Sequence, residues 1–171
     1  LAKDASESGT VSLSFYDAEG EYQDTVAVRG KVIVMSIHDV KTRDAVWNRA
    51  AKFLTLAKEE GFRPLLLVSS TPEDMNEVYS ELPEIASILE EYLYFSDFKT
   101  LITMNRSNGG VTYFCDGYLV RKWSFRGRPD KTELHEMYLG DATETIIGSD
   151  VNGSLAFQGF LLYVFAVMLL L

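Results

Sequence analysis

The sequence predicts an α/β fold with a mixed sheet flanked by helices, and three adjacent segments indicate it. Residues 31–37 read Lys-Val-Ile-Val-Met-Ser-Ile, a β-rich apolar run with too little alternation for a surface strand. An amphipathic helix pattern over residues 46–59 follows, and Gly61 supplies its stop. Residues 64–69 form a second apolar run. A buried strand, a helix and a second buried strand predict two parallel strands joined by a right-handed crossover.

The helix between these strands has one broad apolar side, which includes Trp47 and Phe53. We expect this side to pack against the sheet, because an amphipathic helix buries its apolar face. The strand side chains expected to lie beneath it are Ile33, Met35, Leu65 and Leu67.

The segment before the first buried strand predicts only short elements. Residues 1–10 are small and polar and are typical of a linker. Residues 11–16 alternate enough to predict a strand, and Asp-Ala-Glu-Gly at 17–20 predicts a turn. Residues 22–28 predict a short strand or an extended approach to the sheet.

Helix signals dominate the segment after the second buried strand. Ser-Thr-Pro-Glu-Asp at 70–74 is a strong helix start, with a hydroxyl cap, an early proline and acids near the positive end of the helix dipole. A second short helix is expected over residues 83–91 and a short strand over 92–95. Ser96 or Asp97 then caps another helix.

The C-terminal part of the domain predicts a hairpin and a last helix. Strands at 111–114 and 118–125 flank an Asp-Gly pair at 116–117, which suits a tight type I′ turn. Asp130 and Glu133 have the spacing of a capping box and predict a last short helix. These elements complete one folded domain over residues 11–140.

The end of the chain differs in character. Residues 141–154 form a polar connector that contains acids but no Lys or Arg, and residues 155–171 carry no charge. These seventeen residues reach the lower limit of the length that a membrane helix needs, about 17–25. We expect a transmembrane helix that is cut short at Leu171, in a piece of a longer protein, rather than a buried terminal helix, which should show a polar face. Because cytoplasmic flanks are rich in Lys and Arg, the domain is expected outside the cytoplasm, as in the periplasm.

Composition excludes some functions. The 171 residues have a formal net charge of −9 and a pI near 4.7, which disfavours nucleic-acid binding. Cys115 is the only cysteine, so the chain holds no disulfide and no Cys-x-x-Cys redox site. No phosphate-loop, dinucleotide-binding or zinc-finger spacing is present, and we expect no cofactor and no metal.

The element order describes a thioredoxin-like domain, and three motifs point to a narrower resemblance. They are the segment 96–110, which ends in Asn-Arg-Ser-Asn-Gly-Gly, the Asp-Gly turn at 116–117, and Arg-Lys-Trp-Ser at 121–124. Over residues 11–135 the chain resembles the thioredoxin-like domain carried by bacterial membrane proteins of the DoxX type. That domain has an Arg-Ser-Asn-Pro-Gly loop, a Lys-Asp-Gly hairpin and a Lys-Trp-Ser ending. The resemblance implies a thioredoxin-like fold in a membrane setting.

The chain departs from that family at the redox site. The proline of the family's loop is Gly109 here, although redox-active thioredoxin-like domains use a cis-proline at this point to help bind the substrate chain. The slot of the two cysteines falls on about residues 42–45, which read Thr-Arg-Asp-Ala. The departures argue against oxidoreductase activity.

Three sets of residues remain as candidate sites. A ligand mouth is predicted beyond the first buried strand, since α/β folds place sites there. It would be formed by His38, Asp39, Thr42, Gly109 and Gly110. A basic strip on the hairpin and the following loop predicts a contact surface for lipid or for an acidic partner, centred on Arg121, Trp123 and Arg126. Cys115 is a candidate thiol, although a mid-strand cysteine is more often inert.

We therefore expect a non-catalytic thioredoxin-like domain of a membrane protein. Its role would be to bind or support a membrane-embedded redox or transport partner, which is another membrane protein or a further domain of the same chain. One alternative is a thiol-dependent oxidoreductase that uses Cys115 or a partner's cysteines. The other is a small-ligand binding domain that uses the predicted mouth.

Overall fold

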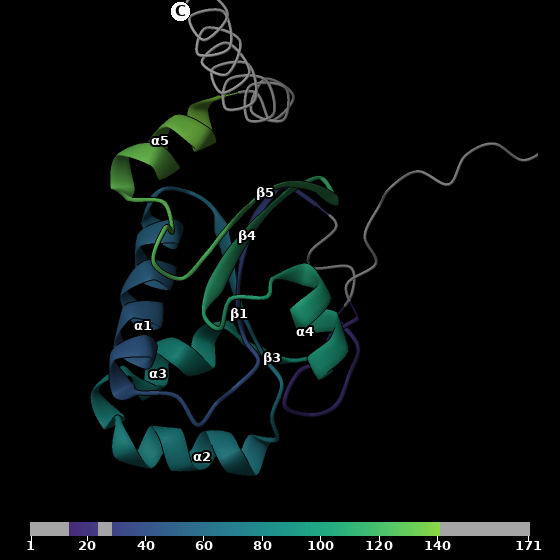
Figure 1. Ribbon diagram of the computed structural model, residues 1–171, viewed down its shortest axis with the longest axis vertical. Coiled ribbons are helices and arrows are strands. Elements are labelled where there is room, and N and C mark those ends of the chain that lie inside the picture. Colours follow the sequence, from purple (N-terminus) through teal and green to yellow (C-terminus); the bar gives the residue numbers. More distant parts are fainter. Residues whose placement is uncertain (1–13, 24–28, 141–171) are drawn as a thin grey trace, which may run out of the picture.

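The computed structural model describes residues 14–23 and 29–140. They form a five-stranded mixed sheet of order β3-β2-β1-β4-β5, with helices on both faces (Figure 1). The strands β1, β2 and β3 are parallel, and β4 and β5 are antiparallel to their neighbours. The strands are β1 Lys31–Ile37, β2 Arg63–Val68, β3 Leu93–Phe95, β4 Gly110–Cys115 and β5 Tyr118–Trp123.

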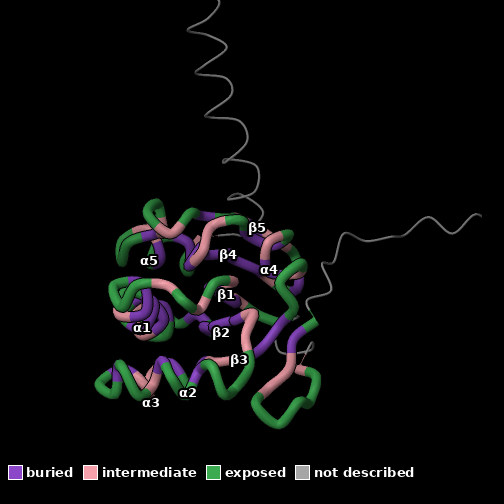
Figure 2. The backbone as a smooth tube through the Cα atoms, turned by 60° about the horizontal axis from the view of Figure 1, so that its bottom comes forward, coloured by how far each residue is buried: buried purple, intermediate pink, exposed green. Residues whose placement is uncertain are grey.

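Two unequal layers of helices cover the sheet, as the purple buried segments in Figure 2 show. Four helices share the larger core on one face, and α4 covers the other face with Phe15 of the N-terminal segment. The helices are α1 Asp44–Glu59, α2 Pro72–Glu81, α3 Pro83–Tyr92, α4 Phe98–Met104 and α5 Lys131–Leu139.

The first buried run is the central strand of the sheet. Six of the seven residues of β1 are buried, because β2 and β4 pair with its two edges and helices cover its two faces. Trp47 and Phe53 of α1 pack in the larger core with Ile33 and Met35, as predicted.

The prediction was wrong for Leu65 and Leu67. These side chains lie on the opposite face, with Val32 and Val34. Leu66 pairs with Met35 in the parallel register, so Leu66 faces α1 instead. Successive side chains of a strand point to opposite faces of the sheet. In a run of three leucines, the sequence does not show which of them faces α1.

The predicted hairpin is present, with a tight turn at Asp116 (φ 48°) and Gly117 (φ 81°). Tyr113 and Cys115 face the larger core and Phe114 faces the smaller one, as alternation predicts. Strand β5 ends at Trp123, two residues earlier than predicted. An irregularity between Tyr113 and Phe114 places one extra residue in β5.

Side chains cap three helices where the sequence indicates a start. Thr71 accepts from the Asp74 amide in a full capping box. Asp97, rather than Ser96, accepts from the Thr100 amide at 3.0 Å. Asp130 accepts from the Glu133 amide at 2.9 Å. Each cap satisfies an N–H group that the helix leaves free, and so fixes where the helix begins.

The end of α5 is hydrogen-bonded to the side chain of Lys31, the first residue of the central strand. The Lys31 ammonium donates to the carbonyl oxygens of Tyr138 and, at 3.3 Å, Gly140, and it lies 4.9 Å from the centroid of the Tyr138 ring. The same ring packs edge-on against Phe62 at 5.4 Å. Gly61 ends α1 with φ +94°, and a Cβ there would lie 2.8 Å from the Tyr138 ring.

Several sequence predictions fall wholly or partly outside the described residues. They are the linker 1–10, most of the segments 11–16 and 22–28, the connector 141–154 and the expected membrane helix 155–171. Among residues 14–23 and 29–140, no helix has the length and apolar character needed to cross a membrane. The predicted turn at 17–20 is present, with the Gly20 amide donating to the Asp17 carbonyl at 3.1 Å.

Candidate functional site

The slot where a dithiol would stand lies at the start of α1. Strand β1 ends at Ile37 and the helix begins at Asp44, with Arg43 in the extended N-cap position. The predicted slot, 42–45, therefore spans the last loop residues and the first turn of the helix. Its sequence, Thr-Arg-Asp-Ala, supplies no thiol at a helix N-terminus, the place where thiolates are stabilised.

The Asn108 side chain joins the two loops beside this slot. Its Oδ1 accepts from the amides of His38 at 2.9 Å and Asp39 at 3.0 Å, and its Nδ2 donates to the Asp39 carbonyl at 3.0 Å. Sequence reasoning missed this residue, although Asn108 is part of the motif on which the resemblance rests. The Asn108 bridge, defined by these three hydrogen bonds, satisfies main-chain groups of the loop that follows β1.

The two glycines of the predicted mouth are packing positions. Gly109 is buried with φ +74°, and a Cβ there would lie 2.7 Å from the Phe125 ring. A Cβ on Gly110 would lie 2.5 Å from the Asn105 side chain, whose Nδ2 donates to the Val111 and Trp123 carbonyls. Neither glycine is exposed to a ligand in this arrangement.

The side chains of the other three residues of the predicted mouth make different contacts. The His38 ring stands edge-on to Phe98 at 5.8 Å, and its buried Nδ1 has no hydrogen-bond partner among the described residues. Asp39 accepts from the Lys41 amide at 3.1 Å. Thr42 lines a pocket together with residues of α1 and α2. No cluster of three or more potential metal ligands occurs in residues 14–23 and 29–140.

The pocket that Thr42 lines lies between the start of α1 and α2, and it is acidic. It has a volume of about 310 Å³, with Val40, Trp47 and Val78 as its apolar lining. Its charged lining consists of Lys41, Asp44, Asp74, Glu77 and Glu81. Hydrogen bonds from Ser70 and Thr71 hold the pKa of Asp74 below its usual value, so this carboxylate stays charged. The surface at the empty dithiol slot is therefore negative.

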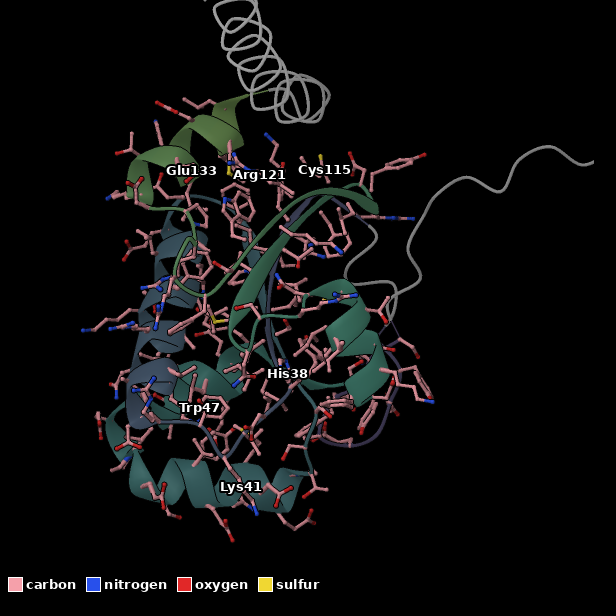
Figure 3. All side chains as sticks on the ribbon, in the orientation of Figure 1. His38, Lys41, Trp47, Cys115, Arg121 and Glu133 are labelled. Carbon is pink, nitrogen blue, oxygen red and sulfur yellow. The ribbon has the colours of Figure 1, made fainter. Side chains whose placement is uncertain are left out.

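Cys115 lies at the other end of the sheet from the slot (Figure 3). It pairs with Lys31, the first residue of β1, whereas the slot follows the last residue, Ile37. Six residue-to-residue steps along β1 separate these ends, which corresponds to roughly 20 Å. Cys115 is half-buried beside Tyr113, and burial is the main cause that raises the pKa of Tyr113. The lone thiol and the slot cannot act on one substrate bond.

The predicted contact surface is divided in the structure. Arg121 forms an ion pair with Glu133 of α5 at 3.1 Å, and the Trp123 Nε1 donates to the same carboxylate at 3.2 Å. Trp123 is 7% exposed, so its ring belongs to the contact between β5 and α5. Arg126 is exposed and lines a different pocket. Sequence reasoning missed Glu133 in this role, because its only signal was the capping-box spacing.

Comparisons with known proteins define the fold. No protein-family model matches the chain, and no curated protein matches it. The thiol:disulfide interchange protein of Chlorobium tepidum matches with a TM-score of 0.53 at 12% identity, over 81% of this chain and 100% of that one. The exposed lipoprotein thioredoxin Etrx1 of Streptococcus pneumoniae matches with a TM-score of 0.52 at 17% identity, over 75% and 98% of the two chains.

A third match is the secreted disulfide oxidoreductase of Mycobacterium tuberculosis described as homologous to E. coli DsbE. Its TM-score is 0.52 at 8% identity, over 74% of this chain and 94% of that one. Identities this low bear on architecture and not on activity. The chain has a thioredoxin-like fold, with a mixed sheet flanked by helices.

Proposed function

We propose that this chain is a redox-inactive thioredoxin-like domain that acts by binding a partner. One observation carries the proposal: the N-terminus of α1 presents Thr-Arg-Asp-Ala, while Cys115 lies roughly 20 Å away at the far end of β1. Disulfide exchange needs a thiolate that can attack and a second thiol that can resolve the mixed disulfide. This chain offers neither at the slot.

The Asn108 bridge supports the same proposal. Redox-active thioredoxin-like domains use a cis-proline in this loop to help bind the substrate chain, whereas here Gly109 stands at that position and Asn108 joins the loop to His38 and Asp39. A closed loop with an acidic pocket beside it is better suited to a fixed surface contact than to turnover.

We further propose that the domain is held at a membrane, outside the cytoplasm. The support is the uncharged sequence at 155–171, the resemblance to DoxX-type proteins, and the absence of Lys and Arg from residues 141–154. Two structural neighbours are described as an exposed lipoprotein and a secreted protein, which agrees with a location outside the cytoplasm. The partner would then be a membrane-embedded redox or transport protein, or a further domain of the same chain.

Insulin reduction in the presence of dithiothreitol tests the redox part. The wild-type chain and the Cys115→Ser variant should both give the rate of the buffer alone, while an active thioredoxin serves as the positive control. Turnover above that rate that is lost in Cys115→Ser would establish the thiol enzyme instead.

Flotation with neutral phosphatidylcholine liposomes tests the membrane part. The 171-residue chain should float with the liposomes, and a chain ending at Ser149 should stay at the bottom of the gradient and keep its native circular dichroism. If the longer chain stays monomeric and does not float, the membrane assignment is wrong.

A further inference from the structure

A basic pocket lies between α1 and the connection from β5 to α5, which run side by side (Figure 1). Its volume is about 320 Å³, and five of the chain's sixteen basic residues line it. They are Arg49 and Lys52 from α1, and Arg126, Arg128 and Lys131 from the connection and the start of α5. Phe53 and Pro129, both buried, give it an apolar floor. Such a concentration of cations is unexpected in a chain of net charge −9.

Little negative charge compensates these cations. Among the residues that the structure describes, Asp130 is the only acid that lines the pocket, and its carboxylate caps α5. Glu60 lies 3.6 Å from the Lys131 ammonium but also contacts His135 at 2.9 Å. Within residues 14–23 and 29–140, Arg49, Lys52 and Arg126 have no carboxylate within ion-pair distance.

Two of the arginines are held in place by Phe125. The Arg128 guanidinium donates to the Phe125 carbonyl at 2.7 Å and lies 5.2 Å from the centroid of its ring. The Arg49 guanidinium lies 5.6 Å from the same centroid. Burial, followed by the charge of Arg49, lowers the pKa of Arg128, and a bound anion would counteract both effects. Ordered guanidinium groups lose little freedom when they bind.

We propose that this pocket binds a phosphate group. A guanidinium group can bind two oxygens of a phosphate at once, and an apolar floor strengthens the attraction by excluding water. The volume leaves room for an organic part against Phe53 and Pro129. The phosphate can belong to a small soluble molecule or to a lipid headgroup. This site lies apart from the dithiol slot, so the proposal does not depend on redox inactivity.

The test follows the amide NMR signals of the ¹⁵N-labelled 171-residue chain in a neutral detergent. The soluble probe is inorganic pyrophosphate, and triglutamate serves as a carboxylate of comparable charge. Pyrophosphate should produce saturable shifts at the amides of residues 126–128, 130 and 131, since Pro129 has no amide hydrogen, and triglutamate should bind more weakly. The Arg49→Gln/Lys52→Gln variant should bind about tenfold more weakly, since it loses two charged contacts at an exposed rim. Lys99→Gln, an exposed lysine on α4 across the sheet, should bind as the wild type does.

A second arm distinguishes the source of the phosphate. Flotation is compared between liposomes of phosphatidylcholine alone and liposomes that also contain phosphatidylglycerol, at a lipid concentration at which only part of the chain floats with phosphatidylcholine. A lipid site predicts stronger flotation with phosphatidylglycerol that is reduced in Arg49→Gln/Lys52→Gln but not in Lys99→Gln. A soluble ligand predicts pyrophosphate binding without that lipid effect.

Three results would overturn the proposal. The first is that neither pyrophosphate nor phosphatidylglycerol acts through residues 126–131. The second is that the double variant behaves as the wild type in both arms. The third is that triglutamate binds as tightly as pyrophosphate, which would make the pocket a site for acidic peptides.

Discussion

Replacement of Asn108 by Ala should destabilise the domain through the loss of a single side chain that joins two loops. The variant loses the three hydrogen bonds to His38 and Asp39. A hydrogen bond contributes about 0.5–1.5 kcal/mol net to the free energy of unfolding. Because Asp39 is exposed and water can replace part of the bridge, we expect a loss of about 2 kcal/mol, less than the roughly 3 kcal/mol of three average hydrogen bonds.

Urea unfolding followed by tryptophan fluorescence measures this loss, since Trp47 and Trp123 are both buried. Asn108→Asp keeps the acceptor for the two amides but places an oxygen opposite the Asp39 carbonyl. It should therefore lower the free energy of unfolding by about half as much as Asn108→Ala does. Asn48→Ala removes one hydrogen bond within α1 and should change the free energy of unfolding by less than about 0.5 kcal/mol.

Amide hydrogen exchange provides an independent readout of the bridge. The amides of His38 and Asp39 should exchange faster in Asn108→Ala than in the wild type, because the side chain that accepts from them is gone. A destabilisation below about 0.5 kcal/mol, or unchanged exchange at these two amides, would show that the Asn108 bridge does not hold the loops together.

Three further predictions concern stability, pH and the thiol. Phe53→Ala should lower the free energy of unfolding by about 3–5 kcal/mol, because Phe53 is 4% exposed, and a loss below about 1 kcal/mol would contradict its core position. Hydrogen bonds from the side chain and main chain of Thr100 hold the pKa of Asp97 below its usual 3.8. The charged Asp97 carboxylate therefore contributes fully to the free energy of unfolding above about pH 4, and this contribution is lost as the pH falls through the pKa of the folded state. In urea titrations at acid pH, the difference in free energy of unfolding between the wild type and Asp97→Asn should become smaller. Cys115 should react more slowly with a thiol reagent in the native chain than in denaturant, since it is half-buried, and equal rates would contradict that placement.

Local sequence signals were enough to predict most of the elements. Apolar runs predicted β1 and β2, and capping residues predicted the starts of α2, α4 and α5. These features depend on residues within a few positions of one another, which a single sequence displays directly. The face of β2 could not be assigned in this way, because Leu65, Leu66 and Leu67 are chemically identical and only pairing with β1 separates them.

The site depends on contacts between distant residues, and for that reason much of it escaped prediction. Asn108 bonds to His38 across seventy residues of sequence. The predicted basic strip separates in three dimensions, because Arg121 turns to Glu133 while Arg126 and Arg128 join Arg49 and Lys52 of α1. A basic residue in a sequence shows its charge but not its neighbours, and the neighbours decide whether that charge is neutralised or available.

The hydrogen bonds between the end of α5 and Lys31 determine which element would receive a mechanical force applied at the C-terminal side. A pull on the chain beyond Gly140 reaches the carbonyl groups held by the Lys31 ammonium, and therefore the first residue of β1. That strand is hydrogen-bonded to β2 on one edge and to β4 on the other. Tension at the C-terminal side is thus shared with the central strand of the sheet, and the last helix does not bear it alone.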